Sequence, residues 1–133
     1  MPLDKGRTIL VVDDENDILI TMKKVLQSEG YSVSTAMNAD EALSLLDSST
    51  VDLIITDIRM PGTDGIQLAK MVKEKDRTVQ VIIMTGQSKV ENPEKLVVPL
   101  DSVGLLRKPF NDIDQLFNLV ELAMDKRIAN PDI

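Results

Sequence analysis

Apolar residues along this chain follow two alternating patterns, which are short continuous runs and longer stretches with helical spacing. The short runs predict five strands, at residues 8–12, 32–36, 52–56, 79–84 and 103–107. Three of these runs are apolar throughout their centres, as expected when helices cover both faces of a parallel sheet. The run at 31–35 instead alternates apolar and polar residues, and it therefore predicts an edge strand.

Helical spacing of apolar residues predicts a helix after each of the first three strands and a last helix near the end of the chain. Gly30 stands where the first helix should stop. Asn38, Asp64 and Asn111 can cap the second, third and last helices. Glu41 follows Asn38 by three residues, which is a variant of the capping box.

The segment from 87 to 100 is different, because Pro93 and Pro99 limit a helix there to about one and a half turns. The fourth helix is therefore predicted to be short or irregular. No internal repeat or low-complexity segment interrupts the 133 residues, and this length suits one domain. We expect the domain to occupy residues 1–126, with 127–133 as a tail or the start of a linker.

Composition excludes several classes of function. The net charge is -7 and there is no basic block, which argues against direct nucleic-acid binding. The chain has no cysteine and no histidine, so disulfides, zinc thiolate sites, cysteine nucleophiles and imidazole bases are all excluded. Apolar runs stay far below the ~20 residues of a membrane span, and the first residues lack an apolar signal core. These features predict a cytoplasmic protein that does not enter a membrane.

Charged residues follow three of the predicted strands. Asp13 and Asp14 follow the first, Asp57 follows the third, and Lys108 follows the fifth. The carboxyl ends of parallel strands share one edge of the sheet, where open α/β folds bind their ligands. Three carboxylates held close together repel one another unless a positive charge compensates, and a divalent cation commonly does so. The sequence therefore predicts a metal-assisted site.

Each of these residues also has a purely structural interpretation. A carboxylate at the position of Asp57 can attack phosphorus in line, or it can simply open the turn that follows. Asp13 and Asp14 suit Mg²⁺, but acids there also favour the first turn of a helix. Thr85 could act as a hydroxyl donor or could be an ordinary β-branched strand residue. Lys108 could act as a mobile charge or could be an ordinary solvated lysine.

The joint pattern resembles the receiver domain of two-component response regulators, over residues 7 to about 126. The resemblance rests on Val11-Val12-Asp13-Asp14-Glu15, on Thr56-Asp57-Ile58-Arg59-Met60-Pro61-Gly62-Thr63-Asp64-Gly65, on Met84-Thr85, and on Lys108-Pro109-Phe110. It implies a flavodoxin-like, doubly wound, five-stranded parallel sheet of order 2-1-3-4-5 with helices on both faces. It also implies Mg²⁺ as cofactor and phosphorylation of Asp57.

The resemblance assigns further roles at the site. Asp14 and Asp57 would bind Mg²⁺ directly, Asp13 would bind it through water, and the backbone carbonyl of Arg59 would complete the shell. Thr85 would reorient when the phosphoryl group arrives.

It makes three more assignments for residues around the phosphoryl group. Lys108 would pair with Asp57 or the phosphoryl group, and a cis peptide between Lys108 and Pro109 would direct it there. Arg59 and Gln87 would set the lifetime of the phosphoryl group.

Two positions depart from the family pattern. Leu105 stands three residues before the lysine, where receivers commonly carry an aromatic switch residue, and Asp101 replaces a usual glycine. An aromatic rotamer switch is therefore excluded at Leu105. With the fourth helix broken, we expect a signal to be carried by a change of order in the loop from 86 to 99.

The predicted function is a signalling switch that accepts a phosphoryl group from a histidine kinase or a histidine phosphotransfer protein and resets by self-catalysed hydrolysis. It is not otherwise an enzyme. The output partner, or a fused effector domain, is not specified, and the last strand and helix could form a homodimer. A pseudo-receiver that works unphosphorylated is one alternative. A phosphohydrolase of the haloacid dehalogenase type is another, although Arg59 occupies the position of its second Asp.

Overall fold

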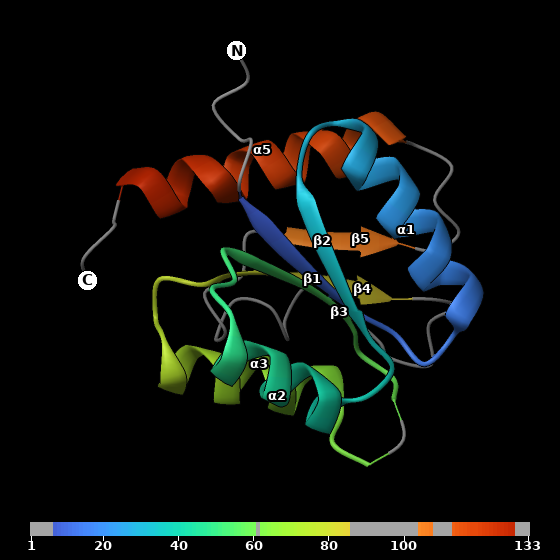
Figure 1. Cartoon of the computed structure of the whole chain (residues 1–133), viewed down its shortest axis with the longest axis vertical. Coiled ribbons are helices and arrows are strands. Elements are labelled where there is room, and N and C mark those ends of the chain that lie inside the picture. Colours follow the sequence, from blue (N-terminus) through green and yellow to red (C-terminus); the bar gives the residue numbers. More distant parts are fainter. Residues whose placement is uncertain (1–6, 61, 86–103, 108–112, 130–133) are drawn as a thin grey trace.

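The computed structural model describes residues 7–60, 62–85, 104–107 and 113–129. Their strands and helices alternate along the chain as far as the fourth strand (Figure 1). In order they are β1 (Thr8–Val12), α1 (Asn16–Ser28), β2 (Ser32–Ala36), α2 (Ala39–Ser48), β3 (Leu53–Asp57), α3 (Gly65–Lys75), β4 (Gln80–Thr85), β5 (Gly104–Arg107) and α5 (Ile113–Ala129).

All five strands belong to one parallel sheet of order β2-β1-β3-β4-β5, as the sequence predicted. Strand β2 lies at an edge, which agrees with its alternating pattern. Strands β3 and β4 each end one residue later than predicted, because Asp57 and Thr85 still pair with the neighbouring strands. These two polar residues are therefore the last residues of their strands.

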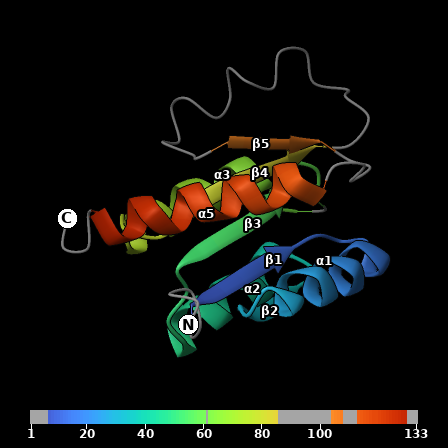
Figure 2. The ribbon, with the colours of Figure 1, turned by 90° about the horizontal axis from the view of Figure 1, so that it is seen from above.

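Helices cover both faces of the sheet (Figures 1 and 2). Helices α1 and α5 pack on one face, and α2 and α3 pack on the other. Side chains of β1 alternate between the two layers, so that Ile9 and Val11 face α1 and α5 whereas Leu10 and Val12 face α2 and α3. All four are fully buried, which explains why a central strand is apolar without interruption.

The helix starts follow the predicted caps where the structure describes them. The Asn38 side chain accepts a hydrogen bond from the Glu41 amide at 2.9 Å, and Glu41 in turn accepts one from the Met37 amide at 2.8 Å. This differs from a capping box, in which Glu41 would bind the amide of Asn38 itself. At α3 the capping box is complete between Asp64 and Gln67.

Other predictions lie outside the described residues. These are the short fourth helix between 87 and 100 and the cap at Asn111. Helix α5 continues through Ala129, beyond the position 126 at which we expected the domain to end. Among the described helices, none combines the length and the apolar character that crossing a membrane requires.

Candidate metal centre

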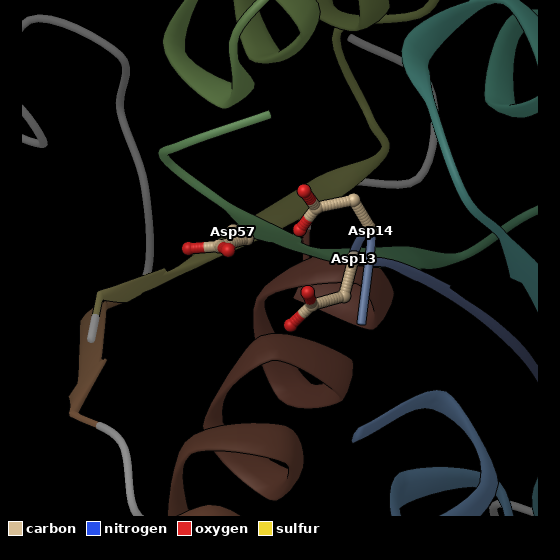
Figure 3. A group of neighbouring side chains, drawn as sticks. All are labelled: Asp13, Asp14 and Asp57. Atoms are coloured by element: carbon tan, nitrogen blue, oxygen red, sulfur yellow. The ribbon is translucent and has the colours of Figure 1, made fainter. Parts of the chain in front are cut away.

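Three carboxylates meet at the carboxyl edge of the sheet. Asp13 and Asp14 directly follow β1, and Asp57 is the last residue of the adjacent strand β3. One carboxylate oxygen from each residue lies within 4.8 Å of the other two. Figure 3 shows the three carboxyl groups directed to the same side of the strands. The structure thus brings together the acids that the sequence placed at strand ends.

The three acids differ in exposure. Asp13 is fully buried and Asp57 is only 6% exposed, whereas Asp14 lies exposed at the surface. The three carboxylates are therefore shielded from solvent on the side of the sheet and accessible to solvent at Asp14, so that an ion can enter there. Asp13 is held in place by its own turn, because its Oδ1 accepts a hydrogen bond from the Glu15 amide at 2.9 Å. Its amide continues the sheet pairing by donating to the Ala36 carbonyl at 3.1 Å.

The donor atoms suit a hard divalent cation. Magnesium and calcium prefer oxygen ligands, and the described cluster offers only carboxylate oxygens. Coulomb repulsion among these groups would favour binding of a positive ion between them. The amino-terminal end of α1 follows directly after the acids, and its dipole also favours negative charge there. The cluster could therefore hold such an ion.

The backbone around Asp57 is fixed by contacts with β4 and α3. The Ile58 amide donates to the Met84 carbonyl at 3.0 Å, and the Gly65 amide donates to the Ile58 carbonyl at 2.9 Å. A Cβ atom on Gly65 would lie 1.9 Å from the Asp57 carbonyl oxygen. Only glycine permits this approach of the helix to the strand end.

Gly65 entered the sequence prediction only as part of the motif that follows Asp57, and its contact with the Asp57 carbonyl was missed. Its position directly after the cap Asp64 was the signal that a helix would begin beside the strand end. The distance between two segments eight positions apart in the chain could not be read from that signal.

Thr85 lies beside the acids on the next strand. It ends β4, it is only 4% exposed, and it pairs with Arg107 of β5, whereas Asp57 pairs with Met84. Thr85 is therefore one residue further toward the carboxyl edge than the partner of Asp57. A hydroxyl at this place can donate a hydrogen bond to an anion bound near the edge.

The remaining predicted residues are only partly described. Arg59 is exposed, two positions beyond Asp57. Leu105 pairs with Ile83 in the sheet, but its side chain is not among the described groups. Gln87, Lys108 and Pro109 lie outside the described residues.

Comparison with known proteins agrees with this geometry. A family model, the response regulator receiver domain, matches residues 9–121. The chain is 37% identical over 116 residues to the DNA-binding transcriptional regulator NtrC of Salmonella typhimurium, covering 87% of this chain and 24% of that protein. It is 34% identical over 113 residues to sporulation initiation phosphotransferase F of Bacillus subtilis, covering 85% of this chain and 90% of that one.

A solved structure shows the same fold. The response regulator protein TrrA of Thermotoga maritima, in complex with Mg²⁺-BeF, superposes with a TM-score of 0.77 and 34% identity. The match covers 88% of this chain and 98% of that one. The chain spans about a quarter of the length of the NtrC regulator and most of the length of the other two proteins. Sequence and structure together show that this chain belongs to the family of response regulator receiver domains.

Proposed function

We propose that this receiver domain is switched by transfer of a phosphoryl group to Asp57, with Mg²⁺ held by the neighbouring acids. The observation that carries the proposal is the approach of the three carboxylates to within 4.8 Å at the ends of two adjacent parallel strands. The family supports it, because the relatives are phosphorylatable response regulators.

Asp57 is the best placed of the three acids to be the acceptor. It ends a strand near the middle of the sheet, and the Gly65 contact and the Ile58 hydrogen bonds fix its backbone. An oxygen of the Asp57 carboxylate would attack the phosphorus of the donor in line. The P–N or P–O bond of the donor would break, and its electron pair would stay on the donor. The product is an acyl phosphate on Asp57.

The metal ligands are the second part of the proposal. Asp14 and Asp57 would bind Mg²⁺ directly, Asp13 would bind it through water, and the Arg59 carbonyl would supply a further oxygen. When bound, the ion neutralises charge on the transferring phosphoryl oxygens. The similar protein TrrA was solved with Mg²⁺-BeF, which supports the choice of this ion.

Other residues would stabilise the phosphoryl group and change conformation when it is present. The Thr85 hydroxyl would donate to a phosphoryl oxygen, and its reorientation would begin the switch. The Lys108 ammonium would pair with the phosphoryl group, directed by a cis peptide to Pro109. Leu105 occupies the position at which receivers commonly carry an aromatic switch residue. The segment from 86 to 99 would therefore transmit the signal by a change of order.

Arg59 and Gln87 would set the lifetime of the acyl phosphate. Arg59 is exposed and close in sequence to the acceptor, so its guanidinium can reach phosphate oxygens and hinder attack by water. If so, the Arg59→Ala variant should lose its phosphoryl group at a different rate from wild type. An unaltered rate of dephosphorylation would remove Arg59 from this role.

The proposed partners are a sensor histidine kinase or a histidine phosphotransfer protein in the cytoplasm. The NtrC relative is named a DNA-binding transcriptional regulator, but the present chain matches only 24% of it. A fused effector domain or a separate output partner is therefore part of the proposal. Homodimerisation through β5 and α5 is a further proposal. The chain itself would catalyse only its own phosphorylation and dephosphorylation.

Intact mass spectrometry tests the acceptor. After incubation with acetyl phosphate and Mg²⁺, wild type should gain the mass of one phosphoryl group, and both Asp57→Asn and an EDTA-treated sample should not. The Asp52→Asn variant is a matched control, because Asp52 is also buried but lies before the start of the same strand. Phosphorylation of Asp57→Asn would contradict the proposal. An unmodified wild type that still bound Mg²⁺ would favour the pseudo-receiver.

A further inference from the structure

A hollow of about 430 Å³ opens between the ends of α2 and α3, far from the metal centre in the fold. It is lined by residues just before β3 and β4 begin, so it lies at the amino edge of the sheet, opposite Asp57. Its apolar lining includes Val51, Val72 and Val79, which are all buried. The volume falls within the range of small-molecule sites, roughly 300–1,000 Å³.

Charges around this hollow favour a cation. Helix α2 ends at Ser48 and helix α3 ends at Lys75, so the negative ends of both helix dipoles point to this part of the surface. The carboxylates of Asp47 and Asp76 also line it, against the single ammonium of Lys75. An anion would meet two carboxylates and two helix carboxyl ends.

Lys75, which is the only cation among the described residues that line the hollow, can be displaced. Lys75 Nζ lies 2.5 Å from Asp47 Oδ1 and so bridges α3 and α2. The two side chains are 45% and 66% exposed, and ion pairs in solvent contribute little free energy. An incoming cation can therefore exchange with Lys75 at Asp47 at little cost.

We propose that this hollow binds a small organic cation, an ammonium or guanidinium group carried on a short apolar chain. The apolar chain would lie over Leu46, which is half-buried, and the charged group would lie at Asp47 and Asp76. A bare metal ion fits less well, because much of the lining is apolar. The inference does not rest on the proposed phosphorylation, since it uses none of the residues of the metal centre.

NMR titration of the ¹⁵N-labelled chain with hexylammonium tests this site. Saturating Mg²⁺ keeps the amine from the metal centre. We expect saturable amide shifts confined to the segments 46–51 and 72–79, which contain the residues that line the hollow. Hexanol, of the same length but neutral, should bind about fivefold more weakly, and hexanoate more weakly still.

Three variants and a control test the role of charge. Asp47→Asn and Asp76→Asn should each weaken hexylammonium binding about fivefold, and Lys75→Gln should strengthen it about threefold. Asparagine keeps the Oδ1 acceptor that Asp76 offers to the Thr78 amide, so folding should be preserved. Glu74→Gln is the matched control, because Glu74 is exposed on α3 but does not line the hollow. It should leave the affinity unchanged.

Several results would overturn the inference. Equal affinity for hexylammonium, hexanol and hexanoate would show an apolar hollow without charge preference. Shifts confined to Asp13, Asp14 and Asp57 would show binding at the metal centre alone. Absence of saturable shifts would show that there is no site. The Asp57→Asn variant should bind the amine as wild type does, so failure of this proposal and failure of phosphorylation can be told apart.

Discussion

The two edges of the sheet both carry acids, and the two groups of acids are held in different ways. At the amino edge, Asp52 Oδ2 accepts a hydrogen bond from the Thr8 amide at 2.9 Å, and its Oδ1 lies 3.9 Å from the Arg7 guanidinium. At the carboxyl edge, Asp13, Asp14 and Asp57 share one space within 4.8 Å. The same two strands, β1 and β3, connect both arrangements.

On the same two strands, the acid at the amino edge stabilises the fold, whereas the acids at the carboxyl edge form the candidate site. A carboxylate that accepts an amide hydrogen bond across strands stabilises their pairing by about 1–3 kcal/mol. Carboxylates at the distances of the metal centre repel one another by roughly 1–3 kcal/mol per ionised pair. We infer that the amino edge fixes the register, while the carboxyl edge keeps negative charge together for an ion.

The largest effect should come from packing at the carboxyl edge. The Gly65→Ala variant places a methyl group 1.9 Å from the Asp57 carbonyl oxygen, so helix and strand must separate. We expect the free energy of unfolding to fall by about 3 kcal/mol. Urea denaturation measures this change.

Gly62→Ala is the control for this variant. Gly62 has a φ of +77° but no atom within 4 Å of an added Cβ, so only backbone strain is introduced. The expected loss is about 1 kcal/mol. Equal losses for the two variants would mean that contact with Asp57 is not what requires glycine at position 65.

A smaller loss is expected at the amino edge. Asp52→Ala removes the acceptor of the Thr8 amide and should lower the free energy of unfolding by about 2 kcal/mol. Because Asp52 lies at the far end of β3 from the metal centre, Mg²⁺ affinity in a calorimetric titration should stay the same. A large loss of Mg²⁺ affinity would show that the two edges are not independent.

The Asp14→Asn variant should instead lose Mg²⁺ affinity and keep its stability. This change removes one carboxylate from the cluster, and Mg²⁺ affinity should fall about tenfold or more. Asp14 is exposed, so unfolding without Mg²⁺ should change by less than about 0.5 kcal/mol. The comparison fails if Asp14→Asn destabilises the fold as much as Asp52→Ala does.

The fold could be predicted largely because central strands are buried on both faces. The run from Ile9 to Val12 is apolar for that reason, and β1 begins and ends as predicted. The ends of β3 and β4 were predicted one residue short, because a polar residue normally signals the end of a strand. Asp57 and Thr85 are polar, but their backbones still pair with the neighbouring strands.

The candidate site could be predicted as far as it depends on strand ends. Asp13, Asp14 and Asp57 meet because parallel strands bring their carboxyl ends to one edge. The need for glycine at position 65 depends instead on the distance between α3 and β3. The hollow between α2 and α3 likewise depends on helix packing, which hydrophobic periodicity does not specify.

Paramagnetic broadening by Mn²⁺ tests the central claim most directly, since Mn²⁺ accepts the same oxygen ligands as Mg²⁺. Substoichiometric Mn²⁺ should broaden the amide signals of Asp13, Asp14 and Asp57 first, and excess Mg²⁺ should restore them. Signals of Asp52 and of residues at the amino edge should stay sharp. Broadening centred on Asp52 or Asp47, or spread evenly over the surface, would contradict a metal centre at the carboxyl edge.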